Sequence, residues 1–155
     1  MIYNILIIGG GPAGVGAGIY AARKKLKTIL ITESFGGQSV VSAVIENWIG
    51  TKEISGYDLA KNLETHLKAQ KEIEIVEGDR VKSIKKLSDT FKVENESGKV
   101  FETKTILLTL GSRRKKLDVP GEKEYDGRGV VYCSICDAPI FQAKDVAVVG
   151  GGNAG

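Results

Sequence analysis

The residues of this chain best suited to chemistry are two cysteines three positions apart, followed at once by an acid. Cys133 and Cys136 are the only cysteines among 155 residues, and Asp137 follows the second. If this segment opens a helix, the two sulfurs can form a small disulfide ring, and the helix dipole favours the thiolate that attacks a disulfide. A neighbouring carboxylate can carry the proton that dithiol formation requires. The spacing therefore predicts redox chemistry at Cys133, Cys136 and Asp137.

Three other interpretations of this segment stay open. A zinc site needs four ligands, and the chain offers two cysteines and a single distant histidine, His66, so we expect no metal. The two thiols could instead be idle. Asp137 could simply cap the helix, a role that does not exclude proton transfer. Redox chemistry comes first because closely spaced cysteines in a cytosolic chain point to redox or metal chemistry before a structural disulfide.

A glycine-rich turn near the start of the chain predicts a dinucleotide site. Gly9, Gly11 and Gly14 follow the apolar run 3–8 with the spacing Gly-x-Gly-x-x-Gly. The first glycine of such a turn makes the tight bend, the second lets the backbone approach a pyrophosphate, and the third lets helix and strand pack closely. The phosphates then meet N–H groups at the positive end of the helix. Glu33 follows roughly twenty residues later, where a carboxylate can accept hydrogen bonds from a ribose. A purely structural turn is the alternative.

The sequence around these residues alternates between strand and helix patterns, which predicts an α/β fold. Four short runs in the middle of the chain, 73–76, 81–84, 90–94 and 100–103, alternate apolar and polar residues. This pattern favours a small antiparallel sheet inserted into the α/β fold, with a hairpin turn at 96–99. The expected strands cover 3–8, 27–32, 73–76, 81–84, 90–94, 100–103, 105–110 and 145–149, and the expected helices cover 14–25 and 56–71.

A second glycine motif occurs at the end of the sequence. Gly150, Gly152 and Gly155 repeat the spacing of the first motif and directly follow the expected buried strand 145–149. A strand and turn without a following helix make half of a binding site. We therefore expect the sequence to be a fragment of a longer protein that binds two dinucleotides. The alternative is that 151–155 is the disordered tail of a complete domain.

These motifs also predict the domain layout. Residues 1–112 are expected to form a dinucleotide-binding domain. The charged stretch 113–121 ends in Val-Pro-Gly and is expected to be a linker. Residues 122–155 are expected to begin a second dinucleotide-binding domain that carries the cysteines.

The composition argues against several classes of function. Lys and Arg number 22 against 19 Asp and Glu, a net charge of +3, and the basic clusters 23–25 and 113–116 are not interleaved with aromatic residues, which argues against a nucleic-acid groove. No segment reaches the roughly 18 apolar residues of a membrane span, and the first residues lack the basic region of a signal peptide. We therefore expect a cytoplasmic protein with no nucleic-acid or membrane partner.

The motifs GGGPAG, FGGQ, IENWIG, VPGE, YCSICD and GGGNAG occur in an order that resembles the thioredoxin reductase family, the class II pyridine nucleotide-disulfide oxidoreductases. The resemblance implies a Rossmann-like, FAD-binding three-layer α/β fold with a small inserted antiparallel sheet, plus the start of a second Rossmann-like domain. It implies FAD on the first glycine turn, NADPH on the second, and a homodimer of the full-length protein.

The resemblance also assigns site residues. Cys133 would attack the protein substrate, Cys136 would lie nearer the flavin, and Asp137 would act as the acid–base group. The FAD contacts would be Gly9, Gly11, Pro12, Ala13 and Gly14 at the pyrophosphate, Glu33 at the adenosine ribose, Gly37, Gln38 and Asn47 along the flavin half, Val81 near the adenine, and Thr109 and Gly111 at the end of a strand that closes on the cofactor. The NADPH turn would comprise Gly150, Gly152, Asn153 and Gly155.

The implied activity is that of an NADPH-dependent thioredoxin-disulfide reductase. NADPH would reduce FAD, reduced FAD would open the Cys133–Cys136 disulfide, and the dithiol would reduce thioredoxin or a thioredoxin-like protein. The chain departs from the family pattern at Thr109 and Leu110, where Ala and Thr are common, and at Ala138, where Gly is common. The second segment of the family's FAD domain would lie beyond Gly155. The alternatives are a catalytically inactive fragment, or a flavoprotein reductase that serves a peroxiredoxin or uses another donor such as ferredoxin.

Overall fold

The computed structural model of this chain describes residues 1–112, 115–132 and 141–152. The chain divides into two compact units, Met1–Ser112 and Arg113–Gly155. All of the assigned helices and strands lie in the first unit, and the described part of the second consists of turns and coil. The assignment of these regions to two cofactor domains and a linker stays a prediction.

The first unit alternates strands with helices and ends in a meander. The strands are β1 (Ile2–Gly10), β2 (Thr28–Phe35), β3 (Ile73–Glu77), β4 (Val81–Lys86), β5 (Phe91–Asn95) and β6 (Val100–Leu108), and the helices are α1 (Pro12–Arg23), the 3₁₀ helix η1 (Gly37–Val41) and α2 (Gly56–Lys68). The expected turn at 96–99 is present, and Asn95 Oδ1 accepts the Lys99 N–H at 2.6 Å within it. The two predicted helices are confirmed, with α2 ending three residues early.

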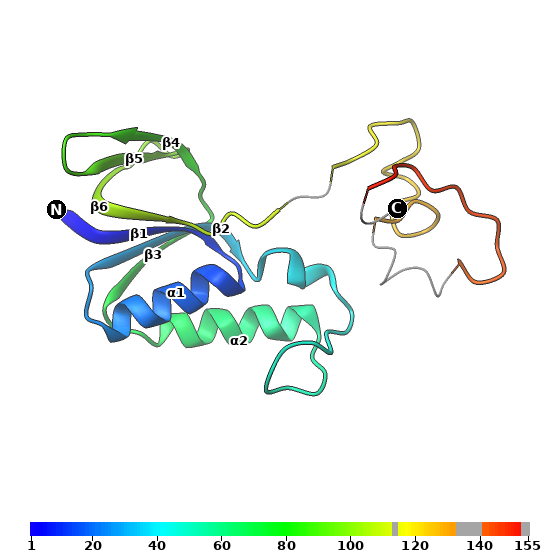
Figure 1. Cartoon of the computed structure of the whole chain (residues 1–155), viewed down its shortest axis with the longest axis horizontal. Helices are drawn as coiled ribbons and strands as arrows, with labels where there is room; N and C mark the ends of the chain where they lie inside the picture. The colour runs from blue at the N-terminus through cyan, green and yellow to red at the C-terminus, as the bar shows by residue number, and fades with distance from the viewer. Residues whose placement is uncertain (113–114, 133–140, 153–155) are drawn as a thin grey trace. The chain divides into compact units, whose positions relative to one another are not determined.

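The six strands form one sheet in the order β3-β2-β1-β6-β5-β4 (Figure 1). β2 pairs in parallel with both β1 and β3, and β1 also pairs in parallel with β6. β5 pairs antiparallel with β4 and with β6. β6 therefore belongs to both parts: Leu108 pairs with Ile8 of β1, and Phe101 pairs with Val93 of β5. The chain has the expected Rossmann-like parallel sheet with added antiparallel strands.

Local chemistry explains where the two helices begin. Pro12 is the first residue of α1, where its missing N–H would have no partner within the helix and its fixed φ suits helical backbone. Ser55 caps α2, because its hydroxyl oxygen accepts the Asp58 N–H at 3.0 Å. The start of α1 carries no side-chain cap. Its first N–H groups, which follow the carboxyl end of β1, therefore have no capping side chain as acceptor.

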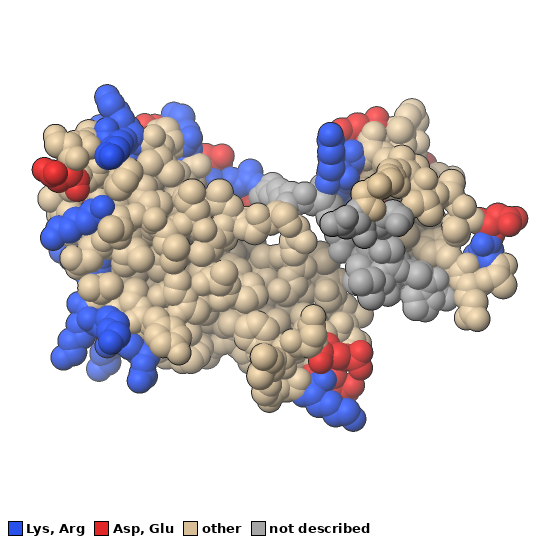
Figure 2. Space-filling model, viewed as in Figure 1, with Lys and Arg blue, Asp and Glu red and all other residues tan. Residues whose placement is uncertain are grey.

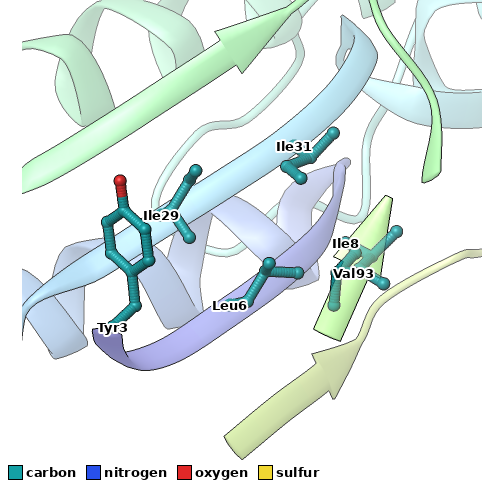
Figure 3. Packing of buried hydrophobic residues seen from close by; sticks show 6 residues of the cluster. All are labelled: Tyr3, Leu6, Ile8, Ile29, Ile31 and Val93. Carbon is teal, nitrogen blue, oxygen red and sulfur yellow. The ribbon is translucent and has the colours of Figure 1, made fainter. Parts of the chain in front are cut away.

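The helices cover one face of the sheet, as Figure 1 shows. On this face Ile7 and Leu30 from the central strands pack with Val15 of α1 and Leu67 of α2, and all four are fully buried. Figure 3 shows six residues of the opposite face, with Val93 of β5 beside the residues of β1 and β2. The antiparallel strands thus cover the second face, giving three layers: helices, parallel strands and meander.

Three predicted strands differ from the structure. Residues 100–103 and 105–108 belong to the single strand β6, because the same backbone pairs with β5 on one edge and with β1 on the other, and the predicted residues 109 and 110 lie beyond its end. That strand is not buried throughout, since Leu108 is 58% exposed. Residues 73–76 belong to β3, which pairs in parallel with β2 rather than joining the antiparallel meander.

The predicted buried strand 145–149 is wrong. These residues are coil, and Val146, Val148 and Val149 are exposed. An apolar run becomes a buried strand only when a neighbouring strand accepts its hydrogen bonds. Among the described residues nothing pairs with 145–149, so the apolar sequence alone does not make the strand.

Charged side chains on the face shown in Figure 2 form separate groups, and the middle of the first unit is occupied by other residues. Lys68 Nζ forms an ion pair with Glu64 in the same helix. It also pairs with Glu77 of β3 at 2.8 Å, which joins α2 to the sheet. No helix in the described part of the chain is long and apolar enough to cross a bilayer.

Candidate functional site

Most of the predicted cofactor residues of the first unit gather where β1, β2 and β6 reach their carboxyl ends. The Thr109 N–H donates to the Ile8 carbonyl at 3.0 Å, which ties the end of β6 to the end of β1. The Gly36 N–H donates to the Gly10 carbonyl at 3.0 Å, which ties in the end of β2. Ligands of open α/β sheets bind at this edge. The helix α1 starts here as well, so its N-terminus faces the same edge.

Gly9 and Gly14 are required by the packing of this turn. Gly9 has φ +114°, and a Cβ there would lie 2.3 Å from the Thr109 carbonyl oxygen. A Cβ at Gly14 would lie 1.9 Å from the Gly9 carbonyl oxygen. Both distances are far inside van der Waals contact, so these two glycines let α1, β1 and β6 approach one another.

Gly11 has no such reason to be a glycine. Its φ of −74° and ψ of −179° are open to any residue, and the nearest atom to a Cβ built there is the Gly37 Cα at 3.9 Å. The open space in front of Gly11 adjoins the N–H groups that begin α1, at the positive end of the helix dipole. These features fit a pyrophosphate group, whose oxygens need N–H donors and a backbone without a Cβ in the way.

The segment after β2, which includes the 3₁₀ helix η1, lies on the other side of this space. Gly37 has φ +57°, which favours glycine, and a Cβ there would lie 3.4 Å from the Gly11 Cα. Gln38 Nε2 donates to the Ser112 carbonyl and, at 3.0 Å, to the Ser112 hydroxyl. This amide therefore joins the loop after β2 to the segment after β6. Sequence reasoning missed Ser112, because a serine in a charged stretch carries no distinguishing pattern.

The residues after β6 close the edge from the other side. Thr109 Oγ1 donates to the Ile8 carbonyl at 2.8 Å, so its hydroxyl binds the protein backbone. Gly111 has φ +62° with nothing near its missing side chain, a conformation that glycine adopts at little cost. Asn47 lies apart in an exposed loop that the Ile45–Ile54 backbone pair closes, and none of the hydrogen bonds between described residues joins it to the glycine turn.

Glu33 and Val81 are brought together by a residue that the sequence did not single out. Glu33 lies near the end of β2, and Val81 is the first residue of β4. Between them, Arg80 places Nε and Nη2 each 2.9 Å from Glu33 Oε2. The contact between Arg80 and Glu33 thus brings the residues predicted for the ribose and the adenine near each other, because Val81 directly follows Arg80.

The second unit contains a buried carboxylate. Glu122 is 6% exposed, and it accepts hydrogen bonds from the Leu117 N–H at 3.2 Å, from the Asp118 N–H at 2.7 Å and from the Tyr132 hydroxyl. Lys116 Nζ lies 4.4 Å from the centre of the Tyr132 ring. Because Tyr132 directly precedes the first cysteine, Glu122 anchors the chain that enters the predicted redox segment.

The remaining predicted residues receive less support. Gly150 and Gly152 lie in exposed coil. A second glycine turn with a helix behind it is not present in residues 141–152. Cys133, Cys136, Asp137, Asn153 and Gly155 lie outside the described residues, and their roles stay predictions.

The comparisons with known proteins agree with this arrangement. The profile of the family described as "Pyridine nucleotide-disulphide oxidoreductase" matches residues 3–155. The chain is similar to an NADH dehydrogenase of Bacillus subtilis, with 45% identity over 153 residues, and to a subunit of the alkyl hydroperoxide reductase of Staphylococcus aureus, with 44% identity over 153 residues. In both cases 99% of this chain is covered, and the chain spans 30% of the relative's length.

Solved structures of similar fold include thioredoxin reductases. The enzyme of Lactococcus lactis superposes with a TM-score of 0.74 at 38% identity, and that of Streptococcus pyogenes with a TM-score of 0.76 at 38% identity. Each superposition covers 90% of this chain and 45% of the solved chain. The chain therefore corresponds to less than half of each of these relatives.

Proposed function

The chain belongs to the pyridine nucleotide-disulphide oxidoreductase family, and we propose that it is the flavin-binding and redox-active part of a disulfide reductase. Members of this family typically bind FAD and NAD(P)H. The observation that carries the proposal is the open space at Gly11, which neither backbone conformation nor packing explains. A dinucleotide pyrophosphate does explain it.

In this proposal FAD lies along the carboxyl ends of β1, β2 and β6. The backbone of Gly9, Gly11 and Gly14 and the start of α1 bind the pyrophosphate, and Glu33 binds the adenosine ribose. Gln38, fixed by its hydrogen bonds to Ser112, lies on the flavin side. When bound, the isoalloxazine ring supplies two-electron transfer between a nicotinamide and a disulfide.

The chain's own contribution to catalysis is thiol–disulfide exchange. The Cys133 thiolate attacks a disulfide sulfur of the acceptor protein, a mixed disulfide forms, and one acceptor sulfur leaves as a thiolate that takes up a proton. The Cys136 thiolate then attacks the Cys133 sulfur, releasing the second acceptor thiolate and leaving a Cys133–Cys136 disulfide. Asp137 takes the proton that Cys136 gives up and donates it to the second acceptor thiolate, and a proton from solvent replaces it on Cys136 when the disulfide is reduced. Two electrons and two protons reach the acceptor in each cycle.

The similarity to thioredoxin reductases supports thioredoxin or a thioredoxin-like protein as acceptor. NADPH as donor and a homodimer as the assembly follow from the family resemblance of the sequence and stay predictions. A second candidate is a reductase that serves a peroxide-reducing partner. It is supported by the 44% identity to the alkyl hydroperoxide reductase subunit over nearly the whole chain. The name of the Bacillus subtilis relative supports NADH as an alternative donor.

The first experiment measures FAD binding to this chain by the quenching of flavin fluorescence. We expect saturable binding of one FAD per chain, and weaker binding of FMN, which lacks the pyrophosphate and the adenosine. Gly11→Ala should abolish this preference for FAD while the circular dichroism spectrum stays that of the unsubstituted chain. Equal binding of FAD and FMN, or no binding of either, would contradict the proposal and favour an inactive fragment.

The second experiment tests the dithiol. A protein that carries this chain together with a complete nicotinamide-binding domain is mixed with NADPH or NADH and either thioredoxin or a peroxiredoxin-type acceptor. Cys136→Ser should stop turnover and leave Cys133 able to form a stable mixed disulfide with the acceptor, whereas Cys133→Ser should form none. Turnover that survives Cys136→Ser would exclude thiol relay and favour direct transfer to another acceptor.

A further inference from the structure

Arg80 is a cationic side chain that the described part of the structure places against Glu33, the predicted ribose residue. Its Nε and Nη2 both lie 2.9 Å from Oε2 of Glu33, so the guanidinium fork holds this carboxylate through one oxygen. Hydrogen bonds from a guanidinium to a carboxylate are among the stronger ones in proteins and fix the geometry of both groups. The contact spans 47 residues of sequence and joins the end of β2 to the start of β4.

The backbone of Arg80 is itself held from several sides. Its N–H donates to Asp79 Oδ1 at 2.7 Å, and its carbonyl accepts the Glu96 N–H at 2.8 Å. The preceding residue is tied to β2, because the Asp79 N–H donates to the Thr32 carbonyl at 3.3 Å. A hydrogen bond from Ser97, first among several contacts, lowers the pKa of Asp79 and keeps that acceptor ionised. These hydrogen bonds therefore fix the backbone from which the Arg80 side chain reaches Glu33.

A contribution to folding stability does not explain why Arg80 and Glu33 are paired. The side chains of Arg80 and Glu33 are 39% and 54% exposed, and ion pairs exposed to this degree typically contribute little to folding stability. The pair does lie where a ligand is expected, with Val81 next to Arg80 and the glycine turn at the neighbouring strand end. A glutamate that must meet a ribose benefits from being ordered beforehand, because its rotamer entropy is then not lost on binding.

We propose that Arg80 is a positioning residue for the adenosine half of the cofactor, which it serves by holding the Glu33 carboxylate at the end of β2. This inference rests on the proposed function, since it takes FAD as the ligand. It adds a residue that no sequence motif indicates. It also makes the effect specific to one half of the cofactor, because FMN has no adenosine for Glu33 to meet.

The experiment compares the dissociation constants of FAD and FMN for this chain and for Arg80→Met. We expect the dissociation constant of FAD to rise about tenfold, a loss of about 1.4 kcal/mol, while that of FMN stays within twofold. Arg80→Lys should recover only part of the affinity, because an ammonium group cannot reproduce the planar fork. Arg23→Met is the matched control, since Arg23 is an exposed arginine at the end of α1, and it should leave both constants unchanged.

A double-mutant cycle with Glu33→Gln completes the test. If Arg80 acts through Glu33, adding Arg80→Met to Glu33→Gln should raise the dissociation constant of FAD by less than twofold. Additive effects of the two substitutions, an unchanged affinity in Arg80→Met, or an equal loss of FAD and FMN would overturn the inference and leave the proposed function intact. If the unsubstituted chain binds no flavin, the proposed function and this inference are both overturned.

Discussion

Gly14 packs so closely against the Gly9 carbonyl that a Cβ at position 14 would lie 1.9 Å from that oxygen. The same turn leaves Gly11 with no neighbour closer than 3.9 Å to an added Cβ. Two glycines of one motif thus differ in purpose: one is needed to close the fold, and the other leaves room in front of the helix. Replacing each glycine by alanine adds a single methyl group and tests the two roles separately.

Gly14→Ala should destabilise the chain by about 3 kcal/mol or more, since the clash is with backbone that cannot turn aside. Gly11→Ala should cost about 1 kcal/mol or less, because alanine is only a poorer helix cap there. Urea unfolding followed by circular dichroism measures both. A Gly11→Ala variant as unstable as Gly14→Ala would contradict the assignment of Gly11 to ligand approach.

Tyr3 should make the stability of the chain depend on alkaline pH. Burial, with the hydrogen bond to Glu74, raises the pKa of Tyr3 to about 12, whereas an unfolded tyrosine titrates near 10. The folded state favours the neutral phenol, so this contribution is complete below pH 10 and is lost as the pH rises from 10 to about 12. Tyr3→Phe should flatten the fall in unfolding free energy across this window. Tyr20→Phe, at an exposed site, should behave like the unsubstituted chain.

Glu122 should hold the second unit together. Glu122→Ala removes the acceptor of the Leu117 and Asp118 amides and of the Tyr132 hydroxyl, and loss of buried hydrogen-bond partners typically costs about 1–3 kcal/mol. Hydrogen exchange at the Asp118 amide should accelerate by about tenfold or more, which corresponds to at least about 1.4 kcal/mol. Glu124→Ala, at an exposed neighbour, is the control, and equal acceleration in both variants would refute a specific role of Glu122.

Leu67 should contribute strongly to the helix-facing core. It is fully buried from α2 among Ile7, Leu30 and Val15, and Leu→Ala at such sites costs about 2–5 kcal/mol. Ile49, which is 99% exposed, provides a contrasting apolar site, where Ile49→Ala should change the unfolding free energy by less than about 0.5 kcal/mol. Comparable losses at the two positions would mean that the core does not lie where the structure places it.

The sequence predicted the first half of the fold well because its signals are local. The apolar run before Gly9 and the proline that starts α1 define the strand, turn and helix without reference to distant residues. The same holds for the amphipathic α2 and the turn after Asn95. Glycine spacing also located the edge where the candidate site lies, because the turn and the strand ends are fixed by that spacing.

The errors arose where structure depends on partners distant in sequence. Two strands were expected in place of β6, because its first half alternates apolar and polar residues and its second half is a continuous apolar run. One backbone nevertheless pairs with both β5 and β1. Residues 145–149 are apolar enough for a strand but find no strand to pair with among the described residues. Arg80 and Ser112 were missed because an isolated arginine or serine has no spacing to recognise, and only the tertiary contacts reveal them.

The shared strand β6 has a mechanical consequence. Its hydrogen bonds to β1 and to β5 mean that the meander cannot detach without disturbing the strand that ends at the glycine turn. The two parts of the sheet should therefore open as one cooperative unit in native-state hydrogen exchange. A force or a binding partner that acts on the β4–β5 hairpin should therefore also perturb Thr109, because Thr109 directly follows β6 and is hydrogen-bonded to the end of β1.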